Sequence, residues 1–195
     1  MNTPNKLTLL RILIAPFFMY FFLLDTFYWR LVSVALFMVA ALTDLADGYY
    51  ARRYGIVTGF GKFMDPLADK VLVSSALISF VALGYVSPLP VMLIVGREFL
   101  ITGVRLLAAY RGVVIMPSPW AKVKTFSQMT VVGLVLVYIT LMKSLQYFNS
   151  PPAGLLEFDY VFVFNLLLWL TAVLTVWTGI SYVVRYFYMI RTVLR

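Results

Sequence analysis

Hydrophobic residues run along this chain in six long stretches, separated by short polar segments. The stretches cover residues 7–27, 31–51, 63–86, 88–111, 121–143 and 160–188. Each is close to the length of about 20 apolar residues that an α-helix needs to cross the hydrocarbon core of a bilayer. The pattern predicts an all-α integral membrane protein of six transmembrane helices, forming a single membrane domain over residues 1–195.

Composition agrees with the hydropathy pattern and narrows the possible chemistry. Of the 195 residues, 63% are hydrophobic and 12% are charged, and the mean hydropathy is +0.93. Soluble proteins average about 45–50% apolar and about 25% charged residues, so the bilayer must solvate most of this surface. The chain contains neither Cys nor His, which excludes disulfides, thiolate chemistry and Cys/His zinc sites. A bound metal would therefore be a hard cation with oxygen ligands, such as Mg²⁺ or Mn²⁺.

The basic residues predict an orientation in the membrane, because cytoplasmic loops carry an excess of Lys and Arg. The net charge is +8. One side collects most of the basic residues: Lys6, Arg52, Arg53, Lys62, Arg111, Lys122, Lys124, Arg191 and Arg195. The other side holds Arg30, Lys143, Glu157 and Asp159. We expect both termini to be cytoplasmic, and we expect no nucleic-acid partner because the basic residues do not form one soluble face.

Four of the eight acidic residues lie close together, where the second stretch ends and the third begins. Asp44 and Asp47 are three apart, and Asp65 and Asp69 are four apart, so each pair shares one face of a helix. The short connecting loop would make the two helices antiparallel neighbours, with both pairs in one polar cavity on the cytoplasmic side. Carboxylates this close repel each other unless cations neutralise them. Two divalent ions would do so, and such pairs of ions suit displacement at phosphorus.

Small residues beside the aspartates indicate that a ligand approaches the backbone. Gly48 lies inside a predicted helix, where it costs about 1 kcal/mol relative to Ala. Gly48, Ala51 and Gly61 would leave room for a nucleotide, and Arg52 could bind a pyrophosphate through two parallel hydrogen bonds. The alternative is that the aspartates pair with neighbouring Arg and Lys residues for stability alone, since charges near a membrane interface are tolerated.

A second group of charges lies in the fourth stretch and at the start of the fifth. Arg97 and Arg105 are eight residues apart and share roughly one helix face, which inside a membrane usually borders a cavity or a partner. Together with Lys122 or Lys124 they could form a phosphate-binding pocket beside the aspartates. The two lysines are two apart, so a regular helix cannot point both at one ligand. The alternative pairs Arg97 or Arg105 with Glu98 or a backbone carbonyl, and leaves the lysines as cytoplasmic anchors.

The spacing of the aspartates resembles the signature of the CDP-alcohol phosphatidyltransferases. The matching residues are Asp44-x-x-Asp47-Gly48-x-x-Ala51-Arg52, then eight residues, then Gly61-x-x-x-Asp65-x-x-x-Asp69. The resemblance implies a six-helix membrane fold, usually a homodimer. It implies a reaction in which the hydroxyl of an alcohol displaces CMP from a CDP-linked lipid.

The resemblance also implies a role for each residue of the signature. Asp44, Asp47 and Asp65 would be the main ligands of divalent metal ions. Asp69 would be a metal neighbour and the general base on the acceptor hydroxyl. The CDP site would be lined by Gly48, Ala51, Arg52 and Gly61.

Further segments are similar to the bacterial phosphatidylglycerophosphate synthases of this family: residues 5–11, 96–99, Arg105 and 122–125. This similarity implies CDP-diacylglycerol and glycerol 3-phosphate as substrates at a bacterial cytoplasmic membrane. Within the first segment, Asn5, Thr8 and Arg11 could reach the nucleotide, or could simply form a helix start and an interface anchor.

Other functions remain open on the sequence. A related enzyme could use another acceptor, such as inositol phosphate or serine, which would make less use of a basic pocket if the acceptor were neutral or zwitterionic. A cation transporter would place acidic groups near the middle of the bilayer, often in broken helices or inverted repeats. Here the acidic groups cluster at one face beside Arg and Lys. A structural scaffold would leave the spacing of the four aspartates without a reason.

Overall fold

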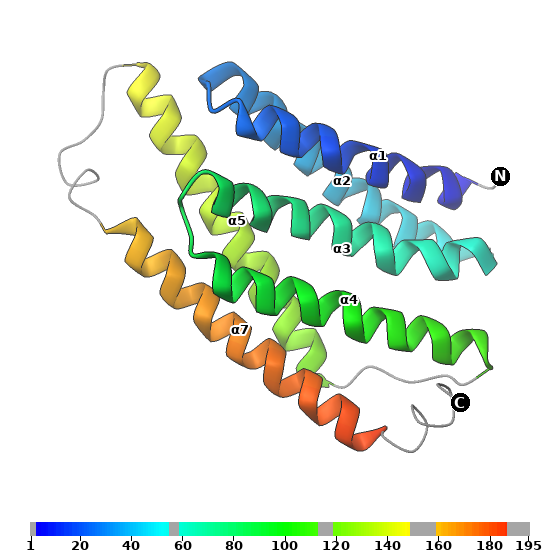
Figure 1. The fold of residues 1–195 in the computed structure, drawn as a ribbon. Helices are drawn as coiled ribbons and strands as arrows, with labels where there is room; N and C mark the ends of the chain where they lie inside the picture. The colour runs from blue at the N-terminus through cyan, green and yellow to red at the C-terminus, as the bar shows by residue number, and fades with distance from the viewer. Residues whose placement is uncertain (1–2, 55–58, 113–118, 149–158, 187–195) are drawn as a thin grey trace.

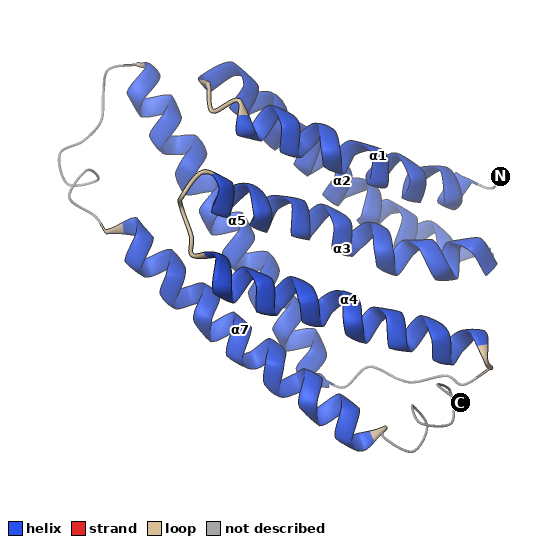
Figure 2. Cartoon of the chain, in the orientation of Figure 1, coloured by secondary structure: helices blue, strands red, loops and turns tan. Residues whose placement is uncertain are grey.

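The computed structural model describes residues 3–54, 59–112, 119–148 and 159–186, and omits the side chains of residues 3–5, 45–54, 59–63, 119, 121 and 122. The described residues form six helices and no strand (Figures 1 and 2). The helices are α1 (Thr3–Leu23), α2 (Phe27–Tyr54), α3 (Gly59–Ala82), α4 (Pro88–Tyr110), α5 (Pro119–Tyr147) and α7 (Tyr160–Arg185). Each helix covers one of the six predicted stretches, which confirms the all-α prediction.

Four of the described helices are long and apolar enough to cross a membrane, so the chain is a multi-pass membrane protein. The apolar spans are Lys6–Leu23, Phe27–Asp44, Val123–Tyr147 and Tyr160–Arg185. Helices α3 and α4 are long enough but less apolar, because they carry charged residues along their length. Among these are Asp65, Asp69 and Lys70 on α3. Six membrane crossings therefore stay a prediction, and the charges that set α3 and α4 apart are those of the predicted site.

Helix α1 packs extensively against both α2 and α3, which contact each other only slightly. Its buried face carries Phe18 and Phe22, four residues apart. The Phe18 ring lies 5.4 Å from that of Phe37 on α2, and the Phe22 ring lies 5.6 Å from that of Phe80 on α3. The prediction of α2 and α3 as close neighbours is corrected, because the aromatic face of α1 fills the space that they would otherwise share.

The helix ends fall into two sets at opposite ends of the bundle. Helix α4 packs against α3 and α7, and α5 packs against α7 and α2. In Figure 1, α1, α3 and α5 begin towards the right, where α2, α4 and α7 end. We call this the charged end, because Asp44, Asp65 and Asp69 lie in these parts of α2 and α3. The start of α1 and the end of α7 thus share one end of the molecule.

The opposite end is held by an ion cluster at the turn between α1 and α2. Asp25 lies in this turn with a positive φ of 50°. Its carboxylate pairs with Arg30 of α2 and, at 2.7 Å, with Lys143 of α5. Arg30 is buried and its guanidinium carbon lies 3.7 Å from the centre of the Phe22 ring. The cluster therefore ties the α1–α2 turn to α5.

Candidate active site

Three of the four predicted aspartates, Asp44, Asp65 and Asp69, lie at the charged end of the bundle. Asp44 of α2 forms an ion pair with Arg11 of α1, with 2.7 Å between Oδ1 and Nη1. The Asp44 side chain is 49% exposed, whereas that of Arg11 is 1% exposed. The charge of Asp44 also interacts with those of Asp65 and Asp69 on α3. The side chain of Asp47 lies outside the described residues.

The two aspartates of α3 have polar partners on different helices. The Thr8 hydroxyl of α1 donates a hydrogen bond to Oδ1 of Asp65. The Lys70 ammonium, on the next residue of α3, lies 2.8 Å from Oδ2 of Asp69. The two carboxylates are one helical turn apart, as their spacing predicted.

Thr8 and Arg11 give α1 a direct part in the site. They are three residues apart on one buried face of α1, and they reach Asp65 and Asp44 on two different helices. Nε and Nη2 of Arg11 are buried without a hydrogen-bond partner among the described residues. Buried donors normally have partners, so this guanidinium suits an anionic group such as a phosphate. The sequence alone allowed two interpretations of Thr8 and Arg11, a ligand site or a helix start. The signal that favours a ligand site is the presence of two polar residues on one face of an otherwise apolar helix.

A second group of charges, which we call the Glu98 cluster, consists of Glu98, Lys70, Arg97 and Lys124. The Glu98 side chain is only 4% exposed. Its Oε2 lies 3.2 Å from Nζ of Lys70, and its Oε1 contacts Nζ of Lys124 and lies 3.6 Å from Nη1 of Arg97. One buried carboxylate thus joins cations from α3, α4 and α5, and Lys70 connects this cluster to Asp69.

The predicted phosphate-binding residues are partly brought together. Arg97 and Lys124 both belong to the Glu98 cluster, and the charge of Arg97 interacts with that of the exposed Arg105. The alternative pairing of Arg97 with Glu98 is confirmed. Lys124 is buried, so its interpretation as a solvent-facing anchor is wrong. The structure describes only the backbone of the remaining predicted residues, which are Gly48, Ala51, Arg52, Gly61 and Lys122.

Comparison of the sequence with known proteins identifies its family. Residues 1–177 match the sequence model of the CDP-alcohol phosphatidyltransferases. The chain belongs to this family. A Bacillus subtilis protein called CDP-diacylglycerol–glycerol-3-phosphate 3-phosphatidyltransferase is 38% identical over 194 residues, covering 93% of each chain. A Rickettsia felis protein of the same name is 37% identical over 181 residues, again covering 93% of each. A probable phosphatidylglycerophosphate synthase of Mycobacterium tuberculosis is 38% identical over 192 residues, covering 94% of this chain and 81% of that protein.

CDP-alcohol phosphatidyltransferases use divalent metal ions, and the donor groups of this member suit them. Asp44, Asp65 and Asp69 supply carboxylate oxygens, and Thr8 supplies a hydroxyl, which are the ligands that Mg²⁺ and Mn²⁺ prefer. Within the described residues, no three acidic side chains lie close enough to enclose an ion by themselves. The predicted ligand set includes Asp47, whose side chain is not among them, so the four-aspartate site stays a prediction.

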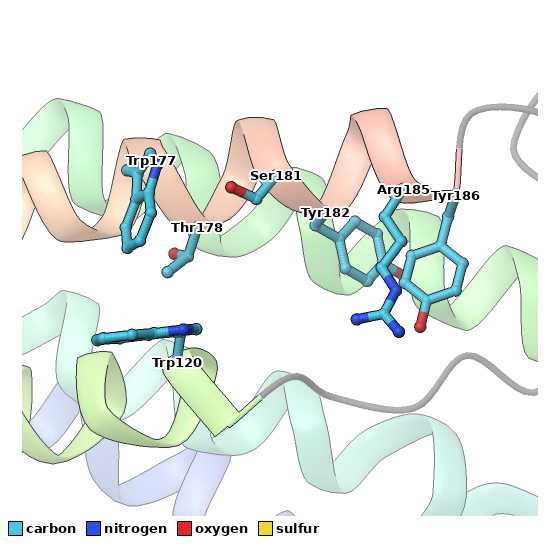
Figure 3. Close-up of a pocket in the computed structure, with 7 residues that line it drawn as sticks. All are labelled: Trp120, Trp177, Thr178, Ser181, Tyr182, Arg185 and Tyr186. Atoms are coloured by element: carbon cyan, nitrogen blue, oxygen red, sulfur yellow. The ribbon is translucent and has the colours of Figure 1, made fainter.

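This family member also has a cavity between α5 and α7 that the sequence did not reveal. It has a volume of about 260 Å³ and is lined by Trp120, Trp177, Thr178, Ser181, Tyr182, Arg185 and Tyr186 (Figure 3). The two indole rings lie 5.5 Å apart, edge to face. The Thr178 hydroxyl accepts a hydrogen bond of 3.1 Å from Arg97, so the cavity wall touches the Glu98 cluster. Trp and Tyr near a span end are typical of a membrane interface, which was the only signal in the sequence.

Proposed function

We propose that this chain transfers the phosphatidyl group of CDP-diacylglycerol to glycerol 3-phosphate, giving phosphatidylglycerophosphate and CMP. Family membership and the names of its bacterial relatives support this reaction. The observation that carries the proposal is the contact between the aspartate group and the Glu98 cluster through Lys70. The reaction needs carboxylates for a metal-bound pyrophosphate and, next to them, cations for the acceptor phosphate. The contact of Lys70 with both Asp69 and Glu98 supports such a pair of neighbouring sites.

The nucleotide lipid would bind at the aspartates. Asp44, Asp47, Asp65 and Asp69 would hold divalent metal, Mg²⁺ or Mn²⁺, and we expect two ions. When bound, such ions neutralise charge on the pyrophosphate and on the departing CMP. Arg11 supplies two further buried donors for a phosphate oxygen. The CDP group would lie along Gly48, Ala51, Arg52 and Gly61, where the small residues would let it approach the backbone.

Asp69 would act as the general base on the acceptor. It takes the proton of the acceptor hydroxyl, whose oxygen then forms a bond to the phosphatidyl phosphorus. The bond from that phosphorus to the CMP oxygen breaks, and CMP leaves. Lys70 holds the Asp69 carboxylate in place through its contact of 2.8 Å. Positioning and charge neutralisation are the main requirements of phosphoryl transfer, so the absence of His does not oppose this chemistry.

The acceptor phosphate would bind to Arg97, Arg105 and Lys124, with Lys122 as a further candidate. In the described part of the site, the three cations of the Glu98 cluster face two carboxylates, Glu98 and Asp69, which leaves one net positive charge. Arg105 adds a second. This surplus favours an anionic acceptor, such as glycerol 3-phosphate, over zwitterionic serine.

We further propose six membrane crossings, with both termini and the polar cavity on the cytoplasmic side of a bacterial cytoplasmic membrane. The common location of the α1 start and the α7 end supports this topology. A homodimer embedded in membrane lipids is the assembly that the family resemblance implies.

The decisive assay measures CMP release from CDP-diacylglycerol by the purified protein in detergent micelles, with one acceptor at a time. We expect turnover with glycerol 3-phosphate and none with serine or inositol phosphate. Turnover with one of the latter and none with glycerol 3-phosphate would reassign the acceptor. Divalent-cation flux into liposomes without any nucleotide, together with no CMP release, would support a transporter instead.

A further inference from the structure

We propose that Glu98 is a positioning residue of the acceptor pocket. Its carboxylate fixes the cations that receive the acceptor phosphate and sets their position relative to Asp69. The inference deepens the proposed function and rests on it for the identity of the acceptor. Glu98 is an anion like the acceptor phosphate and would repel it, so it acts through the cations that it contacts, Arg97, Lys124 and Lys70.

The geometry of the Glu98 cluster supports this role. Lys70, Arg97 and Lys124 come from three different helices and converge on the two oxygens of one carboxylate. Cations buried side by side repel each other and lose their hydration, so a central anion is required to keep them close. With the negative charge in place, the pocket remains a preformed group of donors with a positive surplus. Without it, the cations would separate and the phosphate would lose its aligned partners.

Glu98 also connects the proposed phosphate-binding cations to Asp69, the proposed base on the acceptor hydroxyl. Nζ of Lys70 lies 3.2 Å from Glu98 and 2.8 Å from Asp69. A continuous series of ion pairs therefore runs from Lys124 through Glu98 and Lys70 to Asp69. The phosphate of glycerol 3-phosphate would bind at one end of this series, and its attacking hydroxyl would meet Asp69 at the other. Correct spacing of these two groups is what orients a small acceptor for attack.

Helix α7 supplies an independent feature that holds Arg97 in this cluster. The Arg97 side chain crosses α7 at Gly179, where an added Cβ would lie 3.1 Å from both Cγ and Nε of Arg97. The neighbouring Thr178 hydroxyl accepts a hydrogen bond from Nη2 of the same side chain. A methyl group at Gly179 would therefore force the Arg97 side chain to shift by a few tenths of an ångström. Gly103 on α4 provides a matched control, because a Cβ there meets no described atom within 4 Å.

The first test compares Glu98→Gln and Glu98→Asp with the wild type in steady-state kinetics in detergent, varying each substrate in turn. For Glu98→Gln we expect the KM for glycerol 3-phosphate to rise about tenfold or more, with the KM for CDP-diacylglycerol unchanged. Glu98→Asp, which keeps the charge, should recover part of that loss. A purely structural role would lower only the amount of folded enzyme, and hence the apparent kcat, with both KM values unchanged; that result would overturn the proposal.

The second test covers the case in which Glu98→Gln does not fold. Gly179→Ala should raise the KM for glycerol 3-phosphate several-fold, whereas Gly103→Ala should leave both KM values unchanged. An unchanged KM in Gly179→Ala would refute the positioning of Arg97. Failure of the proposed function is distinguishable, because it would appear as absence of CMP release by the wild type with glycerol 3-phosphate.

Discussion

The two partners of the Arg11–Asp44 ion pair differ in burial, so we expect substitutions of the two residues to destabilise the protein to different extents. Arg11 is 1% exposed and Asp44 is 49% exposed. Asp44→Asn would leave the guanidinium buried without its counter-ion, for which the typical cost is about 3–5 kcal/mol. Arg11→Met would leave a carboxylate that water already reaches, and would place an apolar chain of similar length in the core. We expect that change to cost less than about 1 kcal/mol.

The measurement is thermal unfolding in detergent with a chelator present, so that metal binding does not contribute. For a chain of about 200 residues, 1 kcal/mol corresponds to a shift of about 2–4 °C in Tm. Asp44→Asn should therefore lower Tm by about 6 °C or more, and Arg11→Met by less than about 4 °C. The double variant should be more stable than Asp44→Asn alone, because it no longer buries an unpaired charge. Equal destabilisation by the two single changes would refute this reasoning.

Four further predictions concern the site and the opposite end of the bundle. Asp69→Asn should abolish CMP release while Mg²⁺ still raises Tm, because the base is lost and the other carboxylates remain; loss of both would contradict the assigned role. Arg105→Ala should raise the KM for glycerol 3-phosphate about tenfold and leave that for CDP-diacylglycerol unchanged, as measured by CMP release. Chelation should stop turnover, and Mg²⁺ or Mn²⁺ should restore it and stabilise the fold by about 2.7 kcal/mol at 100 times the Kd. Asp25→Asn should lower Tm by several degrees because Arg30 loses its counter-ion, yet both KM values of the folded enzyme should stay at wild-type levels.

Much of the architecture follows from one-dimensional signals in the sequence. Hydropathy located all six helices, because each needs an apolar surface of the right length. Helical periodicity correctly placed Asp65 and Asp69 one turn apart on α3, whereas the joining of all four aspartates in one metal site stays a prediction. Arg97 and Lys124 both contact Glu98, whereas the phosphate-binding pocket that the sequence predicted for them stays a prediction.

Contacts between helices distant in the sequence could not be predicted in this way. Nothing in the periodicity of α1 showed that it would separate α2 from α3, or that Thr8 and Arg11 would each reach a different helix. The contacts of Glu98 with three cations could not be predicted either, because its sequence neighbour Arg97 was sufficient as an ion-pair partner. Its contacts with Lys70 and Lys124 depend on how α3, α4 and α5 pack.

The pairing of Arg11 with Asp44 also bears on how the chain enters the membrane during synthesis. Arg11 leaves the ribosome 33 residues before Asp44, so α1 alone would present an uncompensated guanidinium to lipid. An Arg at the centre of a spanning helix costs about 2.5–3.5 kcal/mol on insertion scales, which is an upper bound for Arg11 because it lies towards the charged end. Entry of α1 and α2 together as a helical hairpin removes that cost, because Arg11 meets Asp44 and Arg30 meets Asp25 within the same hairpin. Lys143 can join Asp25 only after α5 has been made, so biogenesis would close the far end of the bundle late.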